Sequence, residues 1–184
     1  MRIYGFTNES FVDGPGIRVV VFAQGCDNAC PRCHNPDSWD MHGGEEHSVK
    51  EIIKKIKKAS GRTRETILIL EGNGKKKAPA KKVTGVTFSG GEPFLQADEL
   101  AQVAQAVKKL GLDITTYTGN TYEVLKIRED NGIQTLLDLT DYLIDGLYIH
   151  EKRDINLKFR GSSNQRIIDM NKTRETGSIV LYEE

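Results

Sequence analysis

Three cysteines are the residues of this chain whose type and spacing most clearly suggest chemistry. Cys26, Cys30 and Cys33 form a C-x3-C-x2-C motif, and the 184-residue sequence holds no other cysteine. Thiolates are soft ligands that select zinc, copper(I) or iron–sulfur clusters. Most electron-transfer clusters are closed by four cysteines, so three would leave one iron of a four-iron cluster open to a further ligand. The motif therefore predicts a metal centre that performs a reaction.

A zinc site is the alternative that this spacing leaves open. His34 follows the third cysteine directly, whereas zinc ligands normally come in pairs that are two to four residues apart. His42 and His47 offer a fourth ligand from the sequence beyond. The spacing favours an iron–sulfur cluster and keeps zinc as the second candidate.

A second candidate feature is the segment Thr87-Phe-Ser-Gly-Gly-Glu-Pro93, which ends an apolar run. Two adjacent glycines at a strand end let the backbone turn tightly and approach a ligand closely. Carbonyl groups exposed there accept hydrogen bonds from an ammonium group, and Glu92 adds a carboxylate. A lone Gly-Gly pair is usually a turn, so this segment gains meaning only beside the cysteines.

The elements that must position these residues alternate between strand and helix. Such alternation predicts a parallel α/β sheet with its site at the C-terminal ends of the strands. Both candidate features directly follow expected strands. We expect strands over 17–24, 83–88, 113–118 and 142–149, and a terminal strand over 177–182. We expect helices from the capping box at Ser48 to about Ala59, through Leu100 to Leu110, over 121–128, and around Leu136.

The length favours an incomplete barrel. A complete eight-fold barrel usually takes about 250 residues and at least about 200, and this chain has 184. We expect an α/β fold in the form of an incomplete, laterally open TIM-like barrel, with residues 1–184 as one domain. An open side would admit a bulky substrate, such as a loop of another protein.

Residues 61–82 interrupt the alternation. Thr66 to Leu70 is compatible with a strand, and the glycine- and lysine-rich stretch that follows is typical of an insertion. Like-charge runs are usually solvated, so a solvated loop is the favoured interpretation. Docking to an acidic partner surface is the alternative.

The composition is that of an ordinary globular protein, with 28% charged and 38% hydrophobic residues. The 26 Lys and Arg balance the 26 Asp and Glu, which gives no reason to expect a nucleic-acid or membrane partner. No apolar run approaches the roughly 20 residues that cross a bilayer, and the N-terminus lacks a signal-peptide core. Clustered thiols fit a reducing compartment, so we expect a cytoplasmic protein.

The cysteine motif together with the Ser-Gly-Gly-Glu-Pro segment resembles the radical S-adenosylmethionine (SAM) superfamily. The resemblance implies that the three cysteines hold a 4Fe-4S cluster whose open iron binds the amino and carboxylate groups of SAM. One departure is Arg32, because this position is often aromatic in the superfamily. The resemblance implies SAM-binding roles for Ser89, Gly90, Gly91 and Glu92 at the methionine, Thr118 near the ribose or carboxylate, and Arg32 and His34 at the adenine.

Further segments narrow the resemblance to the activases of glycyl radical enzymes. These are Glu9–Arg18, Gln24-Gly-Cys26 and Cys33-His-Asn-Pro36. The small size and the segment Phe159–Arg166 are more similar to the activating protein of the anaerobic (class III) ribonucleotide reductase. The activating enzyme of pyruvate formate-lyase is the alternative. A zinc-stabilised binding module and a ferredoxin-like carrier are the alternatives from other classes.

The resemblance also implies a mechanism and partners. Flavodoxin or ferredoxin would reduce the cluster, and cleavage of SAM would give a 5′-deoxyadenosyl radical that takes hydrogen from a glycine of the reductase. No side chain is then needed as a general acid or base. Outside the motifs, we expect Arg18 and Arg160 to be either surface or ion-paired arginines or partner contacts. We expect His150 to be structural and Trp39 to be a packing residue.

Overall fold

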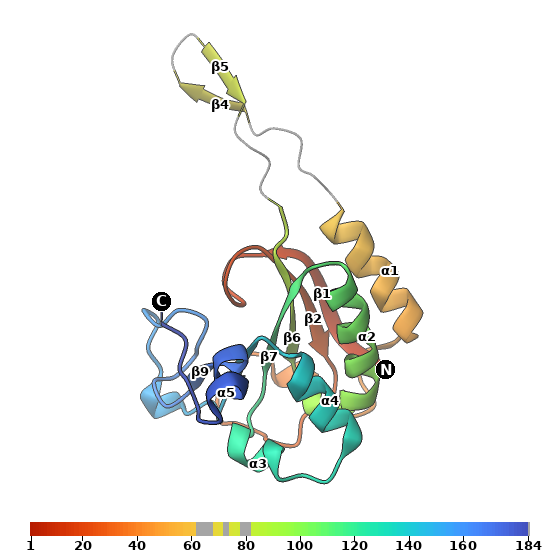
Figure 1. The fold of residues 1–184 in the computed structure, drawn as a ribbon, viewed down its shortest axis with the longest axis vertical. Coiled ribbons are helices and arrows are strands. Elements are labelled where there is room, and N and C mark those ends of the chain that lie inside the picture. The colour runs from red at the N-terminus through yellow and green to blue at the C-terminus, as the bar shows by residue number, and fades with distance from the viewer. Residues whose placement is uncertain (62–67, 72–73, 78–81, 184) are drawn as a thin grey trace.

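The structure is a computed structural model that describes residues 1–61, 68–71, 74–77 and 82–183 (Figure 1). A sheet of seven strands, in the order β3-β1-β2-β6-β7-β8-β9, runs through the described part. The strands are β1 (Arg2–Ser10), β2 (Arg18–Ala23), β3 (Glu45–Glu46), β6 (Gly85–Gly90), β7 (Asp113–Tyr117), β8 (Tyr142–Asp145) and β9 (Arg166–Asp169).

The centre of the sheet is parallel and its edges are antiparallel. Strands β2, β6, β7 and β8 pair in parallel, while β1 joins β2, β3 joins β1 and β9 joins β8 in antiparallel fashion. Among the described strands, β3 and β9 form the two edges and do not pair with each other. The expected α/β class is therefore confirmed, and the open sheet is consistent with an incomplete barrel.

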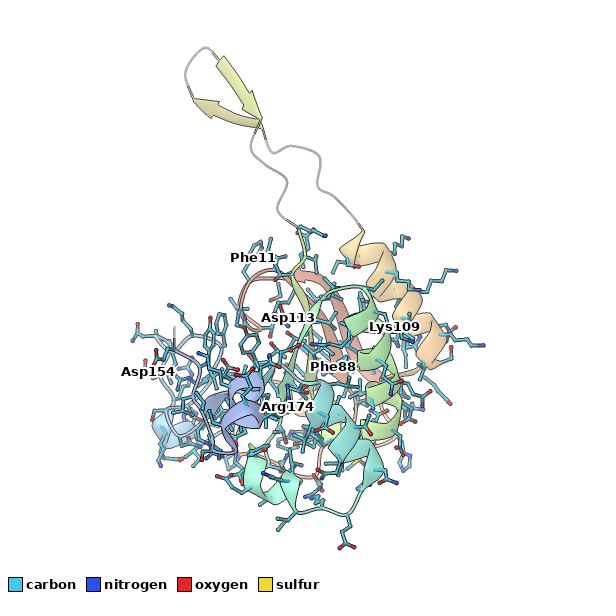
Figure 2. All side chains as sticks on the ribbon, in the orientation of Figure 1. Phe11, Phe88, Lys109, Asp113, Asp154 and Arg174 are labelled. Carbon is cyan, nitrogen blue, oxygen red and sulfur yellow. The ribbon has the colours of Figure 1, made fainter. Side chains whose placement is uncertain are left out.

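Three of the helices pack together against one face of the sheet (Figure 1). Their apolar faces meet the side chains of alternate strand positions, such as Val19, Val21 and Phe88, in one buried cluster. Figure 2 shows Phe88 inside the body of the molecule and Lys109 on its outer surface. These three α-helices are α1 (Val49–Ser60), α2 (Ala97–Lys109) and α4 (Asn131–Leu139), and α3 (Tyr122–Lys126) and α5 (Met170–Thr176) are the other α-helices of the described residues.

Local sequence signals placed the start of α1 and the end of α2 correctly. Helix α1 begins with the expected capping box, because the Glu51 backbone N–H donates to Ser48 Oγ at 3.3 Å and the Ser48 N–H donates to the Glu51 carboxylate at 2.7 Å. Helix α2 gives way to Gly111, whose φ of +72° is a conformation that glycine adopts readily. The expected helices near 121–128 and 136 correspond to α3 and α4.

Several elements differ from the expectations. Strand β8 ends at Asp145, since Gly146 turns the chain at φ +98°. The expected terminal strand over 177–182 is wrong in extent, because only an isolated bridge between Ile168 and Leu181 forms there. Strands β1 and β9 and helix α5 were not expected. Strand β1 is only partly apolar and lies near a sheet edge, so its sequence carries a weak strand signal.

Just over half of the expected insertion at about 61–82 lies outside the described residues. Within it, β4 (Leu68–Glu71) and β5 (Gly74–Lys77) form a separate antiparallel pair, so part of the expected strand over 66–70 is described and Thr66 and Ile67 are not. No helix in the described part of the chain combines the length and apolarity that crossing a membrane requires.

Candidate metal centre and cofactor cavity

A cavity of about 700 Å³ lies where the parallel strands end. Its lining includes Phe22 of β2, Gly90 of β6 and Tyr117 of β7, and also Gly146, which follows β8. Ligand pockets usually enclose roughly 300–1,000 Å³. The cavity therefore occupies the edge of the sheet at which the alternation of elements predicted a site, and it has the volume of a cofactor pocket.

The three cysteines line this cavity together, and each is half-buried. Two turns in the loop bring them to it. Ala29 and Arg32, which precede Cys30 and Cys33, have φ values of +45° and +55° in the left-handed region that non-glycine residues rarely adopt. Between the turns, the Cys33 N–H donates to the Cys30 carbonyl at 3.1 Å.

The cysteine loop is closed at its base by hydrogen bonds that the sequence did not predict. The Gly25 N–H donates to the Ser38 carbonyl at 2.8 Å, and the Cys26 N–H donates to the Trp39 carbonyl at 3.1 Å. The Gln24 side chain adds bonds to two carbonyls near the far end of the loop. The one signal available in the sequence was a polar residue, Gln24, between an apolar run and Gly25. Trp39 itself lines the cavity.

Burial raises the pKa of the Cys26 and Cys30 thiols, and nearby N–H groups oppose this effect. The Asn28 amide lies 3.5 Å from Cys26 Sγ, and the Tyr148 backbone N–H faces the Cys30 sulfur. Binding of a metal would thus release protons from the thiols, and the N–H donors around the sulfurs would stabilise the resulting thiolates. Three soft thiols on one wall of a pocket of this volume fit a cluster. No trio of His, Cys, Asp or Glu in the described ranges is arranged around a single metal ion.

The Gly-Gly segment lies beside the cysteines, and its glycines are required by the packing of strand ends. Gly90 has a φ of +100°, and a Cβ there would lie 2.5 Å from the Ala23 carbonyl oxygen. A Cβ on Gly91 would lie 2.2 Å from the Gly25 carbonyl oxygen. Ser89, Gly90 and Gly91 all line the cavity. The close approach that the glycines permit is therefore one between backbones.

Glu92 is placed differently from the expectation, because its carboxylate is wholly buried behind the cavity wall. Its Oε2 accepts hydrogen bonds from Thr118 Oγ1 at 3.0 Å, the Gly119 N–H at 2.8 Å and the Asn28 amide at 3.2 Å. Burial raises the pKa of this carboxyl, and these donors partly offset the effect. Glu92 joins the ends of β6 and β7 to the cysteine loop, while Thr118 does line the cavity.

The two residues that flank Cys33 point to different places, one into the cavity and one away from it. His34 lines the cavity, whereas Arg32 is exposed and absent from the lining. Arg32 Nη1 lies 2.8 Å from His150 Nε2, and His150 Nδ1 lies 3.1 Å from the Tyr148 hydroxyl. Both ring nitrogens of His150 are thus satisfied, as expected for a structural histidine.

Arg18 is fully buried, so the surface alternative is wrong and the ion-paired one is confirmed. It forms an ion pair with Asp113 at 2.7 Å and donates to Thr87 Oγ1 at 2.7 Å and to the Pro15 carbonyl at 2.8 Å. Arg160 is half-buried and lines the cavity. It belongs to the segment 155–161, which contributes a run of lining residues. In the sequence only the last part of this run, residues 159–161, stood out, through the resemblance to reductase activases.

Comparisons with known proteins agree with this geometry. The family described as the 4Fe-4S single cluster domain matches residues 12–168. The pyruvate formate-lyase-activating enzyme of Clostridium pasteurianum is 38% identical over 130 residues, which cover 68% of this chain and 48% of that protein. The pyruvate formate-lyase 1-activating enzyme of Escherichia coli (strain K12) is 34% identical over 172 residues, which cover 93% of this chain and 61% of that protein.

The chain thus spans about half to three fifths of the length of these relatives. Among solved structures, QueE from Escherichia coli aligns with a TM-score of 0.40 and 16% identity over 78% of this chain and 69% of that chain. The matched residues 12–168 include the cysteine motif, the Gly-Gly segment and most of the cavity lining. The chain therefore belongs to the 4Fe-4S single cluster domain family, as a radical SAM domain related to the pyruvate formate-lyase-activating enzymes.

Proposed function

We propose that this protein is a radical SAM activase that installs a glycyl radical in a partner enzyme. One observation carries the proposal: three thiols and a Gly-Gly strand end meet in one cavity at the C-terminal ends of the parallel strands of an open sheet. The relatedness to activating enzymes supports the same reaction. The cytoplasm is the compartment in which we expect it to work.

The chain's own residues would bind and orient the cofactors. Cys26, Cys30 and Cys33 would hold the cluster, and the segment Ser89–Gly91, with Thr118 nearby, would border SAM. A cluster and SAM bound there would supply one-electron reductive cleavage of the sulfonium, with a flavodoxin or ferredoxin as the electron donor and removal of a hydrogen atom from a partner glycine as the outcome. The remaining task of the cavity walls is to exclude competing hydrogen donors.

A pyruvate formate-lyase-type enzyme is the partner that the named relatives support. The anaerobic ribonucleotide reductase is the second candidate. Its specific support is the segment 159–166, which resembles reductase activases in sequence and contributes Phe159, Arg160 and Gly161 to the cavity lining.

The first experiment tests the cofactors. Protein reconstituted anaerobically with iron and sulfide should be brown and should convert SAM to methionine and 5′-deoxyadenosine when dithionite is added. Replacing any one of Cys26, Cys30 and Cys33 by Ala should abolish the intact cluster and the cleavage together. Protein loaded with zinc serves as the control and should be inactive. A wild-type protein that binds zinc but fails to assemble a cluster would overturn the proposal in favour of a zinc-stabilised module.

The second experiment identifies the partner. The reconstituted protein is incubated with SAM, reductant and either a pyruvate formate-lyase or an anaerobic ribonucleotide reductase, and a glycyl radical is sought by EPR spectroscopy. A radical doublet in one mixture assigns the partner class. If SAM is cleaved but neither enzyme acquires a radical, the protein is a radical SAM enzyme and these two partners are excluded.

A further inference from the structure

The ring of Tyr148 forms part of the cavity wall next to the cysteines. Tyr148 comes from the chain just after β8, and its backbone N–H faces the Cys30 sulfur. Its ring centroid lies 5.0 Å from that of His34, with the two planes at 45°, and both side chains line the cavity. A sequence position far from the cysteine motif therefore places an aromatic surface beside the residue that follows Cys33.

The orientation of this ring is fixed by a chain of polar contacts. Arg32 Nη1 lies 2.8 Å from His150 Nε2, and a guanidinium group only donates hydrogen bonds. Nε2 is then the acceptor, so Nδ1 carries the proton and donates to the Tyr148 hydroxyl, 3.1 Å away. On the ring itself, Gly161 packs so closely that a Cβ there would lie 3.0 Å from Tyr148 Cδ2. The ring is held at its hydroxyl and along one edge.

This arrangement explains why Arg32 stands where the superfamily often has an aromatic residue. Its guanidinium leaves the cavity and binds His150, so it offers no surface to a ligand inside. Tyr148 supplies the missing aromatic surface from a different strand end. Arg32, the residue before Cys33, then influences the cavity wall indirectly, through its contact with His150 and the contact of His150 with the Tyr148 hydroxyl.

We propose that Tyr148 stacks on the adenine of SAM, and that Arg32 and His150 are positioning residues that fix its ring. The inference rests on the proposed function, since SAM is the purine ligand of that function. Stacking of a base on an aromatic side chain changes affinity by about 5- to 150-fold. The neighbouring His34 extends the surface that a purine would contact.

The test uses the two halves of SAM as separate probes on the reconstituted holoprotein. Dissociation constants for 5′-deoxyadenosine and for methionine are measured by equilibrium dialysis. In Y148L we expect affinity for 5′-deoxyadenosine to fall about 5- to 150-fold, with methionine affinity changed less than about twofold. Y148F keeps the ring and should stay within about threefold of wild type. Tyr4 is exposed and outside the cavity lining, so Y4L is the matched control.

The positioning residues have their own signature. R32M and H150L should each weaken 5′-deoxyadenosine binding by about three- to tenfold and leave methionine binding unchanged. R32K should restore the affinity, because an ammonium group also donates to Nε2. A general loss of folding would weaken both probes and would not be rescued by lysine.

Two results would overturn the inference: unchanged 5′-deoxyadenosine binding in Y148L, or equal loss of both probes in that variant. If Y148L takes up less cluster than wild type, Y148M is measured in its place under the same criteria. Failure of the proposed function is a separate result, in which the wild-type protein cleaves no SAM. The probe affinities are measured without turnover, so they test the stacking of Tyr148 independently.

Discussion

Replacing Gly91 by Ala tests whether this glycine serves backbone packing. A Cβ there would lie 2.2 Å from the Gly25 carbonyl oxygen and 3.0 Å from that of Ser38. Cβ contacts under 3.0 Å are essentially never seen, so the first gap must widen by at least 0.8 Å, the difference between 3.0 and 2.2 Å. The substitution therefore forces the ends of β2 and β6 apart at the base of the cysteine loop.

The cost follows from the bonds that cross this contact. The Glu92 N–H donates to the Gly25 carbonyl at 2.8 Å, and the Gly25 N–H donates to the Ser38 carbonyl at 2.8 Å. Each such bond contributes about 0.5–1.5 kcal/mol net, and overpacking costs about 1–3 kcal/mol. Together they predict a loss of roughly 2–6 kcal/mol in the free energy of unfolding of G91A.

The assay is urea unfolding of the metal-free, reduced protein, followed by iron and sulfide content after reconstitution. Gly111→Ala is the control, because Gly111 has a φ of +72° and a Cβ there would meet no atom of the described residues within 4 Å, so only a left-handed penalty of about 1–2 kcal/mol applies. We expect G91A to be less stable than G111A and to hold less cluster. A G91A protein as stable as wild type that fails only to bind SAM would refute the packing argument and assign the glycine to ligand contact.

Two further predictions concern charged side chains. Replacing Arg18 by Met should lower the free energy of unfolding by about 3–5 kcal/mol, because it leaves Asp113 and buried acceptors without their donor. As the control, R128M removes an exposed arginine and should change the free energy of unfolding by under about 0.5 kcal/mol. Equal urea midpoints for the two variants would contradict this prediction. Arg166 lowers the pKa of Glu123 to about 2, so the pair adds stability above the ordinary carboxyl pKa of 4.5 and loses it as the pH falls toward 2. Because Glu123 is 55% exposed, E123Q should lower the free energy of unfolding by only about 0.2–1 kcal/mol at pH 7. In thermal unfolding, the difference in stability between E123Q and wild type should shrink below pH 4.5. A difference that stays constant with pH would argue against the ion pair.

The sequence determined those features that depend on neighbours along the chain. Thiol spacing at Cys26, Cys30 and Cys33 is a local property, and so are the apolar periodicity of α2 and the capping box at Ser48. Alternation of strands and helices then placed the cysteine loop and the Gly-Gly segment at one edge of a sheet, because parallel strands end on the same side. These signals were enough to predict the fold class and the location of the cavity.

Tertiary structure alone decided which side chains face the cavity. The contact between Arg32 and His150 joins residues 118 positions apart, and the ion pair between Arg18 and Asp113 joins β2 to β7 across the intervening strand β6. The Glu92 carboxylate is likewise buried behind the cavity wall because its hydrogen-bond donors come from other loops. Side-chain direction at a loop depends on partners that topology brings near, and no local pattern encodes them. The sequence thus identified the three thiols, and the fold determined what surrounds them.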